Sequence, residues 1–187
     1  MTMETAHRHL LMKVARTALE RAVHDNQRMT PDPAAYPPGL REPRACFVTL
    51  KKKGQLRGCI GSLTARRPLV EEVAAMAYAS ALEDPRFSPV KPEELSDISL
   101  EISALSEPIP FPVSSEQDLI AQVRPGVDGL ILEEGRHRAT FLPSVWDELP
   151  HPRDFLRHLK QKAGLPEDYW SETLTFQRYT VELIHGA

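Results

Sequence analysis

The chain has 187 residues, of which 41% are hydrophobic and 26% are charged, a composition that fits a folded globular protein and excludes disordered, collagen-like and coiled-coil chains. Its 23 basic and 26 acidic residues give a net charge of −3, which excludes general electrostatic binding of nucleic acid or anionic lipid. Even the apolar run from Leu69 to Leu82 contains two glutamates and is too short to span a bilayer. Because the N-terminus has no apolar signal segment and the only cysteines are Cys46 and Cys59, we expect a soluble protein of the reducing cytoplasm.

The first half of the chain predicts two helices and, between them, a β-hairpin. Apolar residues spaced three and four apart from Glu4 to Gln27 predict an amphipathic helix. Five prolines from Pro31 to Pro43 predict a long surface loop, which is either a static crossing or a mobile flap over a site. Strand-forming residues from Cys46 to Leu50, followed by a Lys53-Gly54 turn and residues 56–61, predict the hairpin. The second helix is expected from Leu69 to Leu82.

The second half predicts a strand from Ile98 to Leu105, a short helix around 116–123 and a hairpin over 130–141. A last helix from Pro152 to Ala163 is expected to end at Gly164. This helix is expected to bury Phe155, Leu156, Leu159 and the stem of Lys162.

The final strand, over 174–183, changes its alternation near Gln177-Arg178, which predicts a bulge or a strand break there. Strands occur in adjacent pairs, with helices between the pairs, and each half of the chain holds a hairpin and a helix. The predicted fold class is therefore α+β, with two intimately joined subdomains and mainly antiparallel sheets flanked by helices.

The segment from Arg57 to Gly61 is the most unusual in the chain, because Gly58 and Gly61 both weaken the strand that contains them. Strand alternation places Arg57, Cys59 and Gly61 on one face. A cation beside a thiol favours the thiolate, so Cys59 is a candidate nucleophile or metal ligand and Arg57 a candidate anion-binding residue. The alternative is that Cys59 is a small packed residue and that the glycines allow a helix to pack closely.

Two further positions are candidates for binding. The turn Asp84-Pro85-Arg86-Phe87 follows the second helix and either presents a carboxylate and a cation or contains an aspartate that binds its own loop. Glu101 shares a strand face with Ser99 and Ser103, so it faces solvent or lines a cleft. If Glu101 is buried near Arg57 or Arg86, an ion pair is the first explanation.

The sequence does not predict a metal or a cofactor. Its seven histidines are scattered, without an HExxH motif, a CxxC motif or a histidine pair at helical spacing. There is also no Walker or Rossmann glycine-rich loop and no GxSxG nucleophile motif. These absences argue against ATP, NAD and serine-hydrolase chemistry.

Five segments in this order resemble the AMMECR family, whose prokaryotic members are called AmmeMemoRadiSam system protein A. They are Phe47-Val48-Thr49-Leu50, Leu56-Arg57-Gly58-Cys59-Ile60-Gly61, Asp84-Pro85-Arg86-Phe87, Glu101-Ile102-Ser103-Ala104-Leu105 and Lys162-Ala163-Gly164-Leu165. The resemblance implies a single domain over residues 1–187, built from two interleaved α+β subdomains. It departs at Leu142-Pro143-Ser144-Val145, where the family commonly has glutamine after the proline.

The resemblance implies association with Memo-like and radical SAM proteins, while the family's own activity is unassigned. It singles out seven residues as site candidates: Arg57, Gly58, Cys59, Gly61, Asp84, Arg86 and Glu101. The first hypothesis is an enzyme or substrate-binding component in which Arg57 and Arg86 hold a small anionic ligand and Cys59 acts as a thiolate. The alternative is a noncatalytic partner or scaffold that docks through the same surface. Metal delivery through Cys59 and a histidine is a weaker third possibility.

Overall fold

The computed structural model describes residues 2–186, which form two compact units. Within the described range, unit 1 consists of residues 2–105 with 182–186, and unit 2 of Ser106–Val181, so the second unit is an insertion between two strands of the first. Each unit contains one four-stranded sheet with helices, and the fold is α+β with antiparallel sheets, as predicted. No helix within residues 2–186 is long and apolar enough to cross a membrane.

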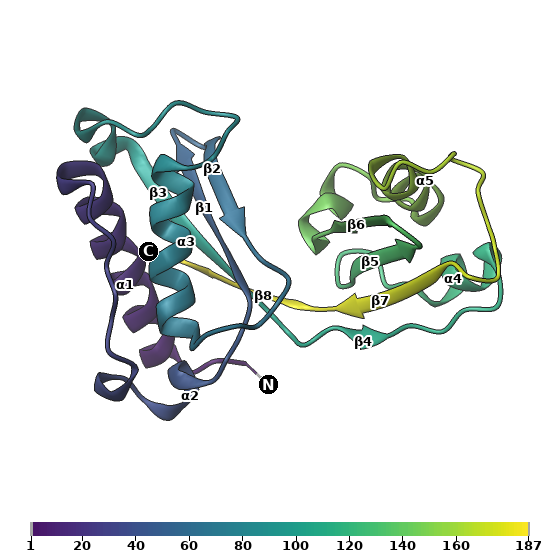
Figure 1. Cartoon of the computed structure of the whole chain (residues 1–187), viewed down its shortest axis with the longest axis horizontal. Helices are drawn as coiled ribbons and strands as arrows, with labels where there is room; N and C mark the ends of the chain where they lie inside the picture. The colour runs from purple at the N-terminus through teal and green to yellow at the C-terminus, as the bar shows by residue number, and fades with distance from the viewer. Residues whose placement is uncertain (1, 187) are drawn as a thin grey trace. The chain divides into compact units, whose positions relative to one another are not determined.

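Unit 1 is a sheet with two helices on one face (Figure 1). Its strand order is β2-β1-β3-β8, with bounds β1 Cys46–Lys52, β2 Gln55–Gly61, β3 Ile98–Leu105 and β8 Val181–His185. The helices are α1 (Thr5–Asp25) and α3 (Leu69–Leu82). Val48, Leu50 and Ile102 are fully buried beneath these helices, so alternate side chains of the same strands lie on the opposite, helix-free face.

The proline-rich segment between α1 and β1 contains two short helical turns, η1 (Pro33–Ala35) and α2 (Pro38–Arg41). Leu40 in α2 is fully buried in the core of unit 1, and the Nε of Arg41 donates to the carbonyl oxygen of Tyr36 at 2.7 Å. Buried apolar contacts anchor this segment, which favours the static crossing over the mobile flap.

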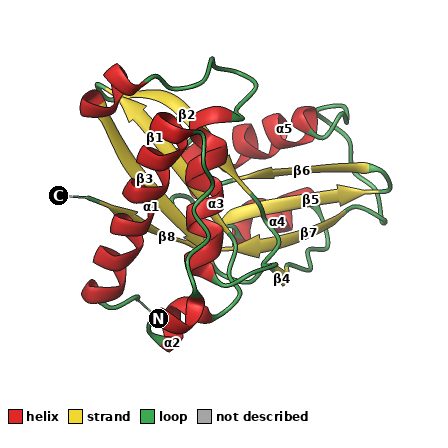
Figure 2. Ribbon diagram, turned by 60° about the vertical axis from the view of Figure 1, so that its left-hand side comes forward, coloured by secondary structure: helices red, strands yellow, loops and turns green. Residues whose placement is uncertain are grey.

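Unit 2 has the strand order β4-β7-β5-β6 and is built around α5, which lies alongside β6 (Figure 2). The strands are β4 Ile109–Pro110, β5 Gly129–Glu134, β6 His137–Phe141 and β7 Thr175–Tyr179, and the helical elements are α4 Glu116–Gln122, η3 Pro143–Asp147 and α5 Pro152–Lys162. Phe155 stacks on Trp146 with ring centroids 3.8 Å apart in the core. In unit 1, η2 spans Pro92–Asp97.

Two details differ from the sequence prediction. The final strand breaks at Thr180, between β7 and β8, and not at Gln177-Arg178. In α5 the buried lysine is Lys160, which is fully buried, whereas Lys162 is exposed and donates to the carbonyl oxygen of Thr140 at 2.9 Å. Gly164 has a φ of +84°, which confirms the left-handed stop after α5.

Candidate functional site

The candidate site lies on the helix-free face of the unit 1 sheet. The strand register places Thr49 of β1 directly opposite both Cys59 of β2 and Glu101 of β3. Directly opposed residues share a face of the sheet, so these three side chains form a row across three strands. All three are half-buried, which leaves the row partly accessible.

The Cys59 thiol is held in this row by a hydrogen bond. Its Sγ lies 3.2 Å from the Oγ1 of Thr49, and either atom can be the donor. Cys46, by contrast, points into the core and is fully buried. Desolvation there raises the pKa of the Cys46 thiol far above its ordinary value. The two cysteines therefore differ sharply in access to solvent.

Asp84 and Arg86 bind the backbone of Cys59 at the outer edge of the sheet. The Oδ2 of Asp84 accepts from the Cys59 N–H at 3.0 Å, and the Nη2 of Arg86 donates to the Cys59 carbonyl at 3.3 Å. The Nε of Arg86 also donates to the Oδ1 of Asp84 at 3.1 Å, and the Arg86 N–H does so at 3.1 Å. Asp84 thus binds its own loop, as one sequence hypothesis proposed, and also brings that loop to the Cys59 segment.

Arg57 has a different position from the one expected. Its Nε and Nη2 donate to the two carboxylate oxygens of Glu94 at 3.0 and 3.1 Å, and its Nη1 donates to the carbonyl oxygen of Ser88 at 2.9 Å. Only 13% of its side chain is exposed. Because a bidentate carboxylate and a backbone carbonyl take up the guanidinium, Arg57 fastens the 88–94 segment to β2 and is not a free anion-binding group.

The two glycines of the segment are required by close packing. A Cβ at Gly58 would lie 2.2 Å from the carbonyl oxygen of Ser80 in α3, and one at Gly61 would lie 2.3 Å from the ring of Phe47. At the same place the Ser80 hydroxyl accepts from the Ile60 N–H at 3.0 Å and donates to the Val48 carbonyl at 2.7 Å. Gly58 thus allows α3 to pack closely, as the packing alternative predicted, whereas Gly61 is required beside Phe47 of β1 and not beside a helix. Close packing accounts for both glycines without a ligand.

Glu101 forms an ion pair, but with neither of the expected arginines. Its Oε1 accepts from the Nζ of Lys51 at 2.8 Å, and 26% of its side chain is exposed. Lys51 lies two residues after Thr49 on β1 and so on the same face. The row on the helix-free face thus contains a thiol, a hydroxyl and a charge-neutral Lys–Glu pair.

Residues 2–186 contain no group of three or more histidine, cysteine or acidic side chains placed to hold a metal ion. The residues that the sequence did not single out are Thr49, Lys51, Ser80 and Glu94. Each of these side chains forms a hydrogen bond or ion pair with a residue on another element. A single sequence does not indicate which residues of different elements will contact each other.

The electrostatics of the site predict an acid-sensitive fold. The Arg86 guanidinium lowers the pKa of Asp84 to about 2, and Arg57 lowers the pKa of Glu94 to about 2. A carboxylate with a lowered pKa adds stability that is present above its unfolded-state pKa and is lost as the pH falls toward its folded-state pKa. We expect the free energy of unfolding to fall by about 2 to 3 kcal/mol per carboxylate between about pH 4.5 and pH 2.

Urea denaturation of the wild type, Asp84→Asn and Glu94→Gln at several pH values measures this effect. The wild type should exceed each variant in stability at pH 6, and the difference should shrink as the pH falls through this range. A constant difference down to pH 2 would contradict the assignment of the acid sensitivity to these two carboxylates.

Comparison with known proteins places the chain in a family. The sequence model of the AMMECR1 family matches residues 12–184. A protein of Methanothermobacter thermautotrophicus is 42% identical over 182 residues, covering 94% of this chain and 92% of that protein. The crystal structure of the uncharacterized protein PH0010 from Pyrococcus horikoshii has a TM-score of 0.88 and 34% identity, covering 97% of this chain and 92% of that chain. The chain therefore belongs to the AMMECR1 family.

Proposed function

We propose that this protein is a cytoplasmic enzyme or substrate-binding component that uses the Cys59 thiol on the helix-free face of unit 1. The observation that carries the proposal is the arrangement around Cys59: a half-buried thiol, a hydroxyl 3.2 Å from the sulfur and a backbone fixed by Asp84 and Arg86. A thiolate is the nucleophilic form of cysteine, and a hydroxyl that donates to the sulfur stabilises that form. A fixed backbone holds the nucleophile in one position.

The substrate class that suits this site is a small molecule with one anionic group. Arg57 is committed to Glu94, but 54% of the Arg86 side chain is exposed. Its Nη1 makes no hydrogen bond within the part of the chain that the structure describes. We propose that this N–H group contacts the anionic group beside the thiol.

Alkylation by iodoacetamide at a fixed pH tests the proposal. In the native protein we expect one modified thiol, which is lost in Cys59→Ser and kept in Cys46→Ser, because Cys46 is inaccessible until the chain unfolds. Thr49→Val keeps the side-chain shape but removes the hydroxyl, so it should slow alkylation of Cys59 about three- to tenfold, the effect of one hydrogen bond. If Cys59 reacts only after denaturation, it is a packing residue and the proposal fails.

A second candidate function is a noncatalytic partner of Memo-like and radical SAM proteins, as the family resemblance suggests. It is favoured by the neutralised charges of this surface, since Lys51 pairs with Glu101 and Arg86 with Asp84. Paired charges lower the desolvation cost of docking a protein. In a pull-down with a Memo-like protein, the variant Arg86→Ala should reduce binding, whereas retained binding would contradict docking through this surface.

A further inference from the structure

Unit 1 contains a hollow at the end of β8, which shares only Glu101 with the row of side chains around Cys59. This groove has a volume of about 670 Å³ and is lined by α1, the start of β3 and the end of β8. Its size lies within the range of small-molecule sites. Its lining includes Met12, Lys13, Arg16, Leu183 and His185.

Two basic side chains of permanent positive charge line the groove, Arg16 and Lys13, and of these only Lys13 is available to bind a ligand. The Arg16 guanidinium is fixed, because it donates to the carbonyl oxygens of Leu95 at 3.0 Å and Ile98 at 3.1 Å and pairs with Glu20 at 3.1 Å. Lys13 is exposed and makes no hydrogen bond or ion pair with any residue in the range 2–186. Its ammonium group is therefore available to an anion.

His185 adds a second donor. This exposed residue lines the groove at the end of β8, and its ring has no hydrogen-bond partner among the described residues. An imidazole can donate an N–H in either of its charge states. Lys13 and His185 together offer two donors but only one permanent charge, which suits a monoanion better than a phosphate dianion.

The remaining lining is apolar or already neutral. Met12 is half-buried, and Leu183 is one of the exposed large hydrophobic residues, with 44% of its surface exposed. Glu101, the acidic residue of the lining, is paired with Lys51 at 2.8 Å. A ligand with an apolar hydrocarbon part next to its anionic group would cover the exposed surface of Met12 and Leu183 and remove that surface from water.

We propose that this groove binds a small organic monocarboxylate with an apolar chain. The carboxylate contacts Lys13 and His185, and the chain lies over Met12 and Leu183. The ligand contacts neither Cys59 nor Arg86, and Glu101, which the groove shares with the Cys59 row, stays paired with Lys51, so this inference does not depend on the proposed function.

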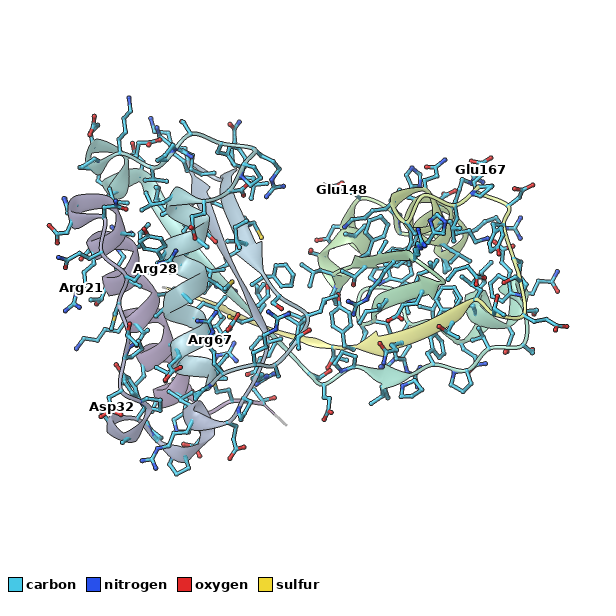
Figure 3. All side chains as sticks on the ribbon, viewed as in Figure 1. Arg21, Arg28, Asp32, Arg67, Glu148 and Glu167 are labelled. Atoms are coloured by element: carbon cyan, nitrogen blue, oxygen red, sulfur yellow. The ribbon has the colours of Figure 1, made fainter. Side chains whose placement is uncertain are left out.

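An NMR titration of the full chain with sodium hexanoate tests the inference. We expect saturable binding, with a dissociation constant that rises about tenfold in Lys13→Gln, the effect of one charge-assisted hydrogen bond. The matched control is Arg21→Gln, which removes an exposed positive charge from the same helix and should leave binding unchanged (Figure 3). Leu183→Ser should weaken binding through the apolar chain.

Three results would overturn the inference. They are the absence of saturable hexanoate binding, an equal effect of Lys13→Gln and Arg21→Gln, and binding of hexylammonium as tight as that of hexanoate. The variant Cys59→Ser should bind hexanoate like the wild type. Loss of hexanoate binding in that variant would also contradict a separate site.

Discussion

Gly58→Ala is expected to lower the free energy of unfolding by about 3 kcal/mol or more, at the upper end of the cost of overpacking. The added methyl would lie 2.2 Å from the carbonyl oxygen of Ser80. This oxygen belongs to the backbone of α3 and cannot rotate away, so the helix or the strand must shift. Such a shift also strains the Ser80 hydroxyl bridge and the contact of Asp84 with the Cys59 N–H. Urea denaturation measures the loss.

The matched control for this substitution is Gly39→Ala, also in unit 1. A Cβ at Gly39 would meet only the ring of His7, at 3.2 Å and 3.3 Å, and that side chain can turn aside. Gly39 lies in α2, where alanine is favoured over glycine by up to about 1 kcal/mol. Equal stability of Gly58→Ala and Gly39→Ala would show that α3 does not depend on its close approach to β2.

Local patterns were sufficient to predict most elements of the fold. The helix from Leu69 to Leu82 and the strand from Ile98 to Leu105 have the predicted bounds, because apolar periodicity and a following proline act within a few residues. The two-residue strand β4 was missed, since Ile109–Pro110 is too short to show alternation. The position of the final break was also missed, because it depends on where the chain leaves one sheet for another.

The sequence prediction named the wrong buried lysine in α5, because lysine is a residue type that is usually exposed. Lys160 follows Leu156 by four residues and therefore lies on the buried stripe of the helix. A lysine is rarely fully buried unless it is paired. Here its Nζ contacts the Glu116 carboxylate at 3.2 Å and the Glu167 carbonyl at 3.3 Å. These partners lie on other elements, so the helical pattern alone could not indicate that Lys160 is buried.

The candidate site was predictable in its parts but not in its connections. The Asp84 turn was correctly located after α3. Alternation placed Arg57 on the same strand face as Cys59, but the register of β1 and β2 shifts between Leu50 and Lys51 and leaves Arg57 without a partner residue on β1, and such an irregularity interrupts the alternation. The pairing of Thr49 with Cys59 requires the strand register, which turn geometry and packing determine together. The partner of Arg57 requires the path of the 88–94 segment, for which the sequence has no periodic signal.

A double-mutant cycle of Arg57 and Glu94 has the second large expected effect. The side chains are only 13% and 14% exposed and form a bidentate pair. Glu94→Ala leaves the largely buried Arg57 charge with only backbone carbonyl partners, so it should lower the free energy of unfolding by about 3 kcal/mol. Arg57→Ala should cost less, about 2 kcal/mol, because Glu94 keeps the Lys52 ammonium at 3.0 Å and the Lys91 N–H at 2.8 Å. The double variant should lose less than the sum, with a coupling of about 2 kcal/mol. Urea denaturation of the wild type, the two single variants and the double variant measures the three losses of stability and the coupling energy.

The control pair is Arg28 and Glu83, because its 3.1 Å distance is similar while 58% and 48% of its side chains are exposed. Solvent screens such a pair, so its coupling should stay below about 0.5 kcal/mol. Strong coupling at Arg57 and weak coupling at Arg28 would establish that Arg57 holds the 88–94 segment against β2. Weak coupling at both pairs would contradict that role, and would return Arg57 to the candidates for binding an anion beside Cys59.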